Sequence, residues 1–188
     1  MALTNCHIQA AADAIENGGI VAYPTEAVFG LGCSPWNEDA LERLLLLKQR
    51  PVAKGLITVA ATETQLNRLA DFSRVDNLEE ILQSWPGPCT WVVPAMDCAP
   101  RNILGDNQEI AVRVSAHPLV SELCRICGPI ISTSANSANQ PPAKTIEAVR
   151  EYFGDSLDYI LPGDLGQEGR PTEIRHARTG QILRAGGA

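Results

Sequence analysis

The 188-residue sequence is poor in aromatic side chains, in basic charge and in long apolar runs. Three Phe, three Tyr and three Trp leave few rings on which nucleic-acid bases could stack, so we expect an aliphatic core. Fifteen Lys and Arg against 22 Asp and Glu give a net charge of −7, which disfavours nonspecific binding to nucleic acid or to anionic membranes. No stretch approaches the roughly 18 apolar residues of a membrane span.

The first residues, Met1 to Cys6, also lack a basic region followed by an apolar run. We therefore expect a soluble, cytoplasmic protein with no membrane partner, in which the six cysteines are reduced. Cys124 and Cys127 form a lone Cys-x-x-Cys pair, which could indicate redox chemistry or half of a zinc site. A tetrahedral zinc site needs more ligands than this pair, so we interpret both as structural cysteines of a helix.

Several nucleotide-binding and hydrolytic signatures are also missing. There is no G-x-x-x-x-G-K-[ST] loop, and Gly30-Leu31-Gly32 lacks the third glycine of a dinucleotide fingerprint. His7, His117 and His176 stand far apart, with no G-x-S-x-G around a serine, which disfavours a hydrolase triad. Any nucleotide must therefore bind through another architecture.

No repeat, linker or low-complexity tract divides the chain, so we expect one domain over residues 1–188. Hydrophobic periodicity and Gly/Pro positions predict alternating helices and strands, which is typical of an α/β layer fold. Thr62 and Gln65 resemble a capping box at the start of one helix. The expected helices cover residues 8–16, 38–48, 62–69, 71–84, 118–126 and 146–153, and the expected strands cover 20–23, 56–60, 90–93, 109–114, 130–131, 157–161, 174 and 182–184.

The stretch from Ile20 to Pro51 contains a strand, a turn and a helix. Pro24 cannot continue a central ladder, so Thr25 and Glu26 should lie at the end of the first strand. Asn37 is the expected N-cap of the helix that follows, because carboxylates occupy the next two positions. One face of this helix carries Leu41, Leu44, Leu45 and Lys48.

Lys48 and Arg50 at the end of this helix have two interpretations. Basic residues in a last turn often complement the negative end of the helix dipole. Alternatively, a lysine on the apolar face must lift its ammonium out of the core, and a cleft at the sheet edge is within its reach. The sequence alone leaves both open.

Polar side chains follow the apolar pair Ile130-Ile131. Ser132-Thr133-Ser134-Ala135-Asn136 brings four hydroxyl or amide groups together after an expected strand, which suits binding of phosphate or ribose oxygens. An ordinary polar turn is the alternative, because Ser and Asn are common turn residues.

Many segments of the chain, in order, resemble the YrdC-type threonylcarbamoyl-AMP synthases, in particular their short, single-domain bacterial form. The first segment is Tyr23 to Gly32, followed by Leu47-Lys48-Gln49-Arg50-Pro51. Each segment alone is weak, but the ordered set is specific and spans nearly the whole chain. The remaining segments are residues 54–57, 84–90, 111–114, 117–119, 132–136, 171–174 and 183–184.

The resemblance implies a fold and a reaction. The fold is a twisted, open, mixed α/β sheet with flanking helices and a concave basic face. Members of this family condense L-threonine, bicarbonate (or CO2) and ATP to threonylcarbamoyl-adenylate and pyrophosphate, for the N6-threonylcarbamoyladenosine modification of tRNAs that read ANN codons. Mg2+ is implied as a cofactor with ATP, and downstream threonylcarbamoyl transferase proteins are implied as partners.

The motif positions also imply roles for individual residues, and no residue is implied as a metal ligand. Lys48 and Arg50 would be catalytic and bind the ATP phosphates. Threonine would be bound by Thr25, Arg113 and Thr172, with Arg113 pairing with its carboxylate. The tail segment Thr172-Glu173-Ile174 departs from the commoner Ser-Thr-Ile form. The full set of implied ATP-binding residues is Lys48, Arg50, Ser134, Asn136, Thr145 and Arg184.

These residue types suit the chemistry. Threonine carbamate is an anion that must attack the α-phosphate of a polyanion, so fixed cations have to bring negative groups together and stabilise the departing pyrophosphate. We expect catalysis by positioning and electrostatics, in a basic cleft built from Lys48, Arg50, Lys54, Arg113 and Arg184. Two alternatives remain. One is an RNA-binding module of the same fold that contacts tRNA or rRNA weakly, and the other is a hydrolase that acts without ATP.

Overall fold

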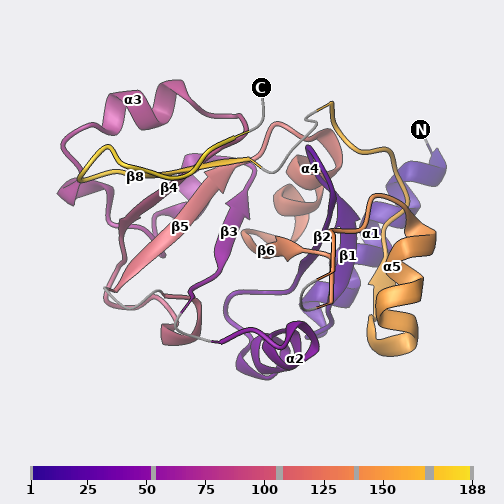
Figure 1. Ribbon diagram of the computed structural model, residues 1–188. Helices are drawn as coiled ribbons and strands as arrows, with labels where there is room; N and C mark the ends of the chain where they lie inside the picture. Colours follow the sequence, from indigo (N-terminus) through magenta and orange to yellow (C-terminus); the bar gives the residue numbers. More distant parts are fainter. Residues whose placement is uncertain (1, 52–53, 105–107, 138–139, 168–171, 187–188) are drawn as a thin grey trace.

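A nine-stranded mixed sheet forms the centre of the structure, which is a computed structural model that describes residues 2–51, 54–104, 108–137, 140–167 and 172–186 (Figure 1). The strand order is β7-β1-β2-β6-β3-β5-β4-β8-β9. The pairs β1–β7, β3–β5 and β4–β8 are parallel, and the other neighbours are antiparallel. The strands are β1 (Val21–Pro24), β2 (Phe29–Gly32), β3 (Ile57–Ala60), β4 (Cys89–Pro94), β5 (Glu109–Val114), β6 (Ile130–Ser134), β7 (Tyr159–Ile160), β8 (Glu173–His176) and β9 (Ile182–Arg184).

Helices cover both faces of this sheet. In the described part of the chain, none of them is long and apolar enough to cross a lipid bilayer. The α-helices are α1 (Ala2–Glu16), α2 (Glu38–Lys48), α3 (Leu78–Gln83), α4 (Pro118–Cys127) and α5 (Ile146–Phe153), and the 3-10 helices are η1 (Glu63–Leu66), η2 (Phe72–Arg74), η3 (Arg101–Ile103) and η4 (Gly154–Ser156).

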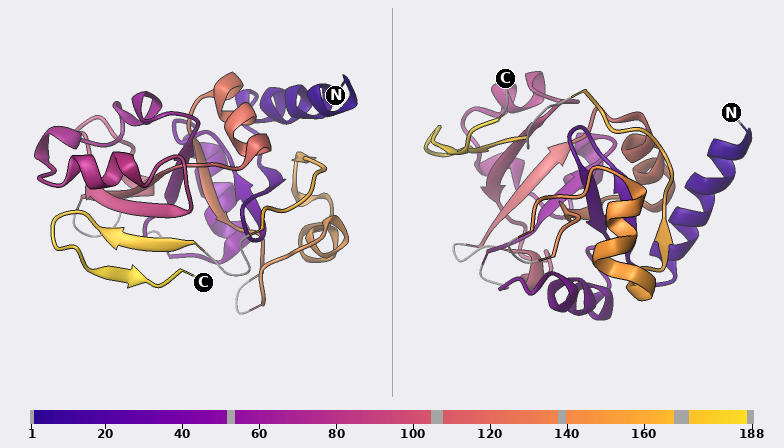
Figure 2. Two further views of the ribbon diagram at one scale, coloured as in Figure 1. Left: turned by 90° about the horizontal axis from the view of Figure 1, so that it is seen from above. Right: turned by 45° about the vertical axis from the view of Figure 1, so that its right-hand side comes forward.

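Two apolar clusters lie on opposite faces of the sheet. Helices α1 and α4 pack together with Tyr23 of β1 and Val59 of β3 in one cluster. Helices α2 and α5 contribute to the other, which contains Ala22 and Ala60, the strand neighbours of those two residues. Successive strand residues point to opposite faces, so this alternation assigns the clusters to the two sides. Figure 2 shows the paired strands β8 and β9 at the outer edge of the sheet.

Helix α2 forms as the sequence predicts. The side chain of Asn37 accepts a 2.9 Å hydrogen bond from the Ala40 amide, which confirms it as the N-cap. Gln49 ends the helix in the left-handed conformation (φ 49°). The predicted inward face is also confirmed, because its buried residues include Leu41, Leu44, Leu45 and Lys48.

Strand β2 was not predicted, because its sequence Phe29-Gly30-Leu31-Gly32 carries two glycines and little strand propensity. Close packing accounts for Gly32: a Cβ there would lie 2.3 Å from the carbonyl oxygen of Ile131 and 2.8 Å from the Tyr23 ring. The Tyr23 hydroxyl donates a 3.1 Å hydrogen bond to the same carbonyl. Tyr23 thus links β1 to β6 across β2, and the turn between β1 and β2 places Thr25 and Glu26 at the strand end, as predicted.

Strand β6 is longer than predicted. The sequence placed Ser132, Thr133 and Ser134 in a polar segment after the strand, but they are its last residues and pair with β2 or β3. Their backbone groups are held on both sides of the strand by the sheet, which overrides the turn preference of Ser. Their side chains therefore have fixed positions in the middle of the sheet.

Two further local predictions were wrong. Thr62 makes no side-chain cap; instead the Gln65 side chain accepts from the Ala61 amide (2.8 Å) and donates to the Cys124 carbonyl (2.7 Å), so only the short η1 forms. The single helix expected over residues 71–84 is divided into η2 and α3, because Val75 is extended (φ −117°, ψ 118°) and ends η2. The Asp71 carboxylate caps the start of η2, where it accepts from the amide and hydroxyl of Ser73.

The cysteines of the Cys-x-x-Cys pair lie on α4 and are free thiols. The Cys124 thiol donates to the Val59 carbonyl, and the Cys127 thiol to the Leu123 carbonyl. Burial raises the pKa of both thiols, that of Cys127 to about 12, so neither forms a reactive thiolate at neutral pH. This environment agrees with a structural role.

Candidate active site

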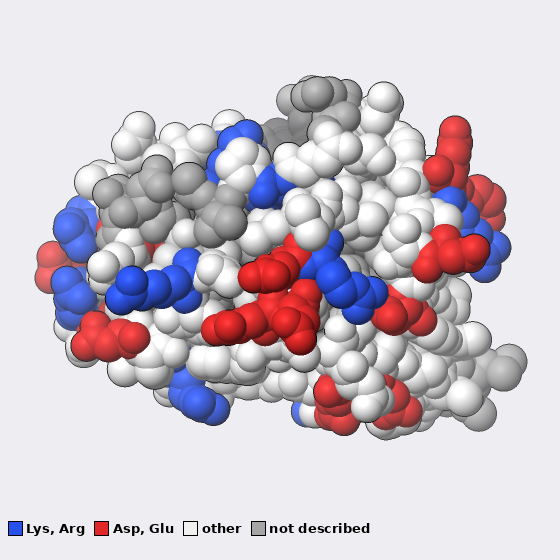
Figure 3. All heavy atoms as spheres, turned by 90° about the horizontal axis from the view of Figure 1, so that it is seen from below, with Lys and Arg blue, Asp and Glu red and all other residues white. Residues whose placement is uncertain are grey.

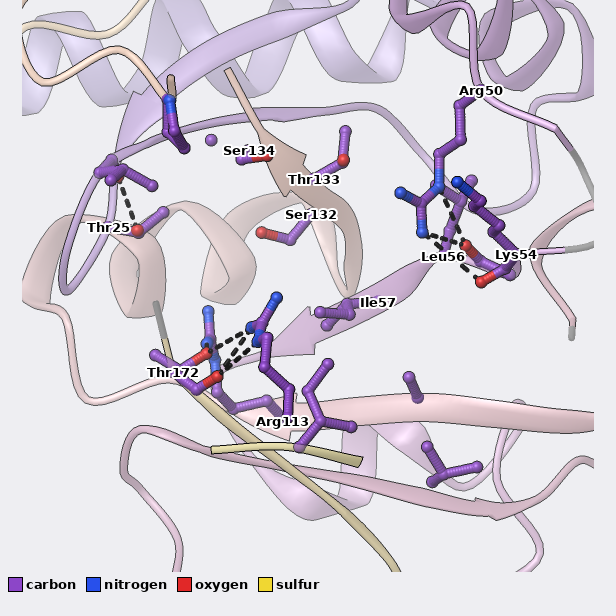
Figure 4. A pocket seen from close by; sticks show the side chains of 18 of the residues that line it. Thr25, Arg50, Lys54, Leu56, Ile57, Arg113, Ser132, Thr133, Ser134 and Thr172 are labelled. Atoms are coloured by element: carbon purple, nitrogen blue, oxygen red, sulfur yellow. Dashed lines mark hydrogen bonds between the residues drawn. The ribbon is translucent and has the colours of Figure 1, made fainter. Parts of the chain in front are cut away.

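A cavity of about 380 Å3 opens where the β1–β2 turn, the segment after α2, and strands β4, β5, β6, β8 and β9 meet. Figure 4 shows three groups of polar side chains in it: Arg50 with Lys54 at one end, Arg113 with Thr172 at another, and Ser132, Thr133 and Ser134 between them. Apolar side chains complete the lining, and they include Val28, Leu56, Ile57, Val92, Ile103, Ile174 and Leu183.

Arg50 forms the first cationic end of this pocket. Its Nη2 and Nε donate to the Gly55 carbonyl at 2.9 and 3.3 Å, which fixes the guanidinium beside Lys54. Gly55 has φ +58°, a left-handed conformation that glycine adopts without strain. Burial lowers the pKa of Arg50, but an arginine remains charged at neutral pH. The loop after α2 therefore carries a fixed positive charge.

Arg113 and Arg184 form the second cationic end, and both contact Thr172. Nη1 of Arg113 donates to the Thr172 hydroxyl at 2.6 Å. Arg184 donates from Nε and Nη2 to the Thr172 carbonyl, at 2.9 and 2.7 Å. The pKa of Arg184 is lowered first by burial and then by the nearby Arg113 and Arg50. A bound anion would relieve this repulsion between like charges.

The charge balance of the pocket is strongly positive. Four cationic side chains line it (Arg50, Lys54, Arg113, Arg184), and Glu109 is the one carboxylate among the described lining residues. Glu109 is also engaged elsewhere, because its Oε2 lies 3.1 Å from Nε2 of His176. An acidic protein thus holds a concentrated positive charge in a hollow with apolar walls, which favours a compact polyanion.

Hydroxyl groups supply the neutral hydrogen-bonding capacity of the pocket. Figure 4 shows the side chains of Ser132, Thr133 and Ser134, which project from β6 and line the pocket. Thr25 lies across from them, and its hydroxyl donates to the Val28 carbonyl at 2.7 Å, which leaves its oxygen lone pairs for a further partner. Such groups can bind phosphate, ribose or amino-acid oxygens.

Lys48 reaches the predicted polar segment but not the pocket lining. Its ammonium donates to the carbonyls of Ser134 and Asn136, both at 2.6 Å, and to Oδ1 of Asn136 at 2.8 Å. The Ser134 hydroxyl donates to the same Oδ1 at 2.7 Å. Burial, and then the charge of Arg50, lower the pKa of Lys48 to about 8. The lysine therefore fastens the end of α2 to the end of β6.

Thr145 lies outside the pocket lining as well. Its hydroxyl accepts a 3.2 Å hydrogen bond from the Ala148 amide, so it is the N-cap of α5. The hydroxyl is thereby engaged at the start of α5 and not at the pocket.

The pocket brings together six of the nine residues that the sequence selected as ligands: Thr25, Arg50, Arg113, Ser134, Thr172 and Arg184. Lys48 and Asn136 lie directly behind Ser134, and Thr145 caps a helix. Pro171, in the quoted tail segment, lies outside the described residues. Sequence reasoning missed Glu26, which is buried against Arg113; its position beside Thr25 in the turn was the available signal.

The part of the chain that the structure describes offers no metal site of its own. Among the described residues, no group of three or more His, Cys, Asp or Glu side chains is placed to hold a metal ion. The donor set of the pocket is cationic, which does not suit direct binding of Mg2+.

Comparison with known sequences agrees with this geometry. The family model Sua5_yciO_yrdC, described as "Telomere recombination", matches residues 13–186. A threonylcarbamoyl-AMP synthase of Pseudomonas paraeruginosa is 51% identical over 182 residues, which covers 97% of this chain and 98% of the relative. The protein of that name in Pseudomonas putida strain F1 is 47% identical over 184 residues, covering 98% of this chain and 100% of the relative.

Solved structures share the fold. Sua5 of P. abyssi, complexed with L-threonine, matches with a TM-score of 0.87 and 33% identity over 95% of this chain. This chain spans 54% of that protein, about half of its length. YciO of E. coli matches with a TM-score of 0.84 and 25% identity, over 98% of this chain and 91% of YciO.

Proposed function

The chain belongs to the Sua5_yciO_yrdC family, and on this premise we propose that it is an enzyme that condenses L-threonine, bicarbonate and ATP to threonylcarbamoyl-adenylate and pyrophosphate. This is the reaction of a threonylcarbamoyl-AMP synthase, a nucleotidyl transfer that serves tRNA modification. The single observation that carries the proposal is the pocket that gathers Arg50, Lys54, Arg113 and Arg184 in one cavity.

The two cationic ends of the pocket suit the two anionic substrates. Threonine and its carbamate carry carboxylates, and ATP carries a triphosphate, so the reactants repel one another in water. Fixed guanidinium groups at separate ends can bind both, and the effective concentration of the carbamate at the α-phosphate then rises steeply. No covalent intermediate with the protein is required. Positioning and charge stabilisation supply the catalysis.

We assign the individual residues accordingly. Arg113, Thr172 and Thr25 bind threonine, and Arg113 pairs with its carboxylate. Arg50 and Ser134 bind ATP and stabilise charge on the departing pyrophosphate. Arg184 of β9 contacts ATP from the threonine end of the pocket, where the two substrates meet. Lys54, drawn beside Arg50 in Figure 4, adds charge at that end.

In this proposal, Lys48 and Asn136 do not contact the substrates but support a residue that does. Their hydrogen bonds hold the Ser134–Asn136 segment in place, so they contribute to ATP binding through Ser134. Thr145 caps α5 and, in this proposal, stabilises the fold rather than the bound substrates.

The remaining partners follow from the reaction. Bicarbonate is the carbon source of the carbamate, and Mg2+ accompanies ATP. Threonylcarbamoyl transferase proteins receive the adenylate, and the supply of tRNA and ATP places the reaction in the cytoplasm. The synthases that this chain matches over nearly their full length support threonine and ATP as its substrates.

An RNA-binding role as the main activity has less support. The face drawn in Figure 3 carries Asp and Glu side chains around its middle, with Lys and Arg side chains beside them. The described part of this face therefore shows no continuous basic band. A net charge of −7 and nine aromatic rings offer little to a phosphate backbone or to unstacked bases.

Pyrophosphate release is the direct test. We expect release from ATP that requires both threonine and bicarbonate, and a product that contains the threonylcarbamoyl and adenylate groups by mass spectrometry. Release that is indifferent to threonine would refute the synthase, and tight, steeply salt-dependent tRNA binding without turnover would favour the RNA-binding module.

A further inference from the structure

Glu26 is a buried carboxylate directly behind the pocket wall. It follows Thr25 in the β1–β2 turn, is 6% exposed and is not part of the lining. Its Oε2 lies 3.3 Å from Nη2 of Arg113, and its Oε1 accepts a 2.6 Å hydrogen bond from the Ser115 hydroxyl. The side chains of Glu26 and Arg113 are 7% and 5% exposed, so this ion pair is nearly excluded from solvent.

The Glu26 carboxyl is ionised in this environment. Burial on its own would raise its pKa, but the Arg113 guanidinium and the Ser115 hydroxyl outweigh that effect, and the pKa lies below its usual value. At neutral pH the pair is therefore a full ion pair, with little water to screen it.

The backbone that carries Glu26 is also fixed. The Thr25 amide donates to the Val28 carbonyl at 3.1 Å, and the Gly166 amide donates to the Thr25 carbonyl at 2.9 Å. A Cβ at Gly166 would lie 2.7 Å from Cα of Glu26, so the segment around Gly166 passes directly against the turn. Thr25 faces the pocket and Glu26 faces Arg113 from the same rigid turn.

Two nitrogens of Arg113 have partners in this chain, one through a hydrogen bond and one through an ion pair. Nη1 donates to Thr172, as Figure 4 shows, and Nη2 faces Glu26. Nε is buried and has no hydrogen-bond partner among the described residues. A guanidinium carries five N–H donors in a fixed plane, so the hydrogen bond of Nη1 and the ion pair of Nη2 together set the direction of the remaining donors.

We infer that Glu26 is a positioning residue for threonine: it holds the Arg113 guanidinium in the orientation in which its free N–H groups receive the carboxylate of the substrate. The inference rests on the proposed function, in which Arg113 binds that carboxylate. Glu26 touches no substrate and moves no proton.

Glu26 acts on the orientation of the Arg113 guanidinium rather than only on its charge. Without Glu26, the hydrogen bond to Thr172 would be the one described contact that orients the Arg113 guanidinium, and threonine would have to order the remaining side-chain freedom on binding. Arg50 takes its own anchor from Gly55 and has no contact with Glu26 among the described hydrogen bonds and ion pairs. Loss of the Glu26 charge should therefore affect threonine far more than ATP.

The test is the near-isosteric substitution Glu26→Gln, with pyrophosphate release as the assay. We expect KM for threonine to rise roughly ten- to a hundredfold, because Arg113 loses its buried ion-pair partner, while KM for ATP changes less than about twofold. Ser115→Ala, which frees the carboxylate without changing its charge, should raise KM for threonine in the same direction but less. Asp158→Asn is the matched control, because Asp158 pairs with Arg43 at 3.0 Å outside the pocket.

A double-mutant cycle shows whether Glu26 acts through Arg113. We expect Glu26→Gln to add little to the loss caused by Arg113→Lys, because both changes remove the same oriented guanidinium. A product of the two single losses overturns the inference. So does a fall in KM for threonine, which is the result expected if Glu26 only neutralises Arg113. An equal rise in both KM values with a lower Tm would make Glu26 merely structural.

The same assay separates this inference from the proposed function. If the wild-type protein releases no pyrophosphate in response to threonine and bicarbonate, the proposed function fails. If the wild type is active and the Glu26→Gln and Ser115→Ala variants keep its KM for threonine, only the inference fails. If Glu26→Gln does not fold, Ser115→Ala and Arg113→Lys, alone and combined, show whether the inference holds.

Discussion

Replacement of Lys48 by methionine tests whether this lysine supports the pocket or binds phosphate itself. The ammonium has three oxygen partners, but two of them keep a second donor: the Ser134 carbonyl accepts from the Asn136 amide at 3.0 Å, and Oδ1 of Asn136 accepts from the Ser134 hydroxyl. In Lys48→Met only the Asn136 carbonyl loses its one protein donor among the described residues, a cost of about 1–3 kcal/mol.

Removal of the buried charge works in the opposite direction. A lysine pKa lowered from 10.5 to about 8 corresponds to about 3 kcal/mol against the charged form. The two effects nearly cancel, so we expect the free energy of unfolding of Lys48→Met to stay within about 2 kcal/mol of the wild-type value, a Tm shift below about 8 °C. In contrast, kcat/KM for ATP should fall about ten- to a hundredfold, because the Ser134–Asn136 segment loses its charged anchor.

Asn136→Ala provides the decisive comparison. If Lys48 acts by holding Asn136 and Ser134, the double variant should lose little more kcat/KM than Lys48→Met alone. A direct phosphate ligand would instead give losses that multiply. Lys144→Met, at an exposed lysine, is the control. Multiplied losses, or a Tm lower by well over 8 °C, would refute this reasoning.

Three further predictions follow from the same contacts. The pKa of Lys48 is lower in the folded than in the unfolded state, so the unfolded chain binds more protons between pH 8 and 10.5. In this range the free energy of unfolding of the wild type, relative to that of Lys48→Met, should rise with pH by at most about 1.4 kcal/mol per pH unit. Denaturant titrations at several pH values measure this slope. Thr145→Ala should cost about 1 kcal/mol in thermal unfolding through loss of the cap, with KM for ATP unchanged; a large rise in KM would restore Thr145 as a ligand. Arg50→Lys should raise KM for ATP about tenfold or more, because an ammonium cannot reproduce the two hydrogen bonds to Gly55 that orient the guanidinium; unchanged kinetics would remove Arg50 from the site.

The sequence predicted most elements that have a clear period or a clear cap. Helix α2 is an example, because Asn37 and the spacing of its leucines indicate both its start and its inward face. Strand β2 escaped prediction, because Gly30 and Gly32 are selected by the Tyr23 ring and by β6, which lie near them only in the folded chain. The end of β6 was misplaced for a similar reason: its Ser and Thr residues are kept extended by pairing with β2 and β3.

The sequence predicted the site residues that line the pocket, but not the roles of the residues that support the pocket from outside. Arg113 and Arg184 were selected and do share a pocket. The position of Lys48 was predicted, but only the structure shows that its ammonium is occupied by three oxygen atoms. The sequence placed Glu26 beside Thr25 in the turn but did not select it, because its significance lies in a contact with Arg113, which is distant in sequence.

The pocket is completed only late in the synthesis of the chain. Its walls include the turn at Thr25 and, from the far end of the chain, Thr172 and Arg184. A ribosome presents that turn long before β8 and β9 emerge, so a nascent chain has no place where both substrates can be gathered. Threonine and ATP therefore cannot act as templates for the early steps of folding; they can stabilise the newly made protein only after its last strands have joined the sheet.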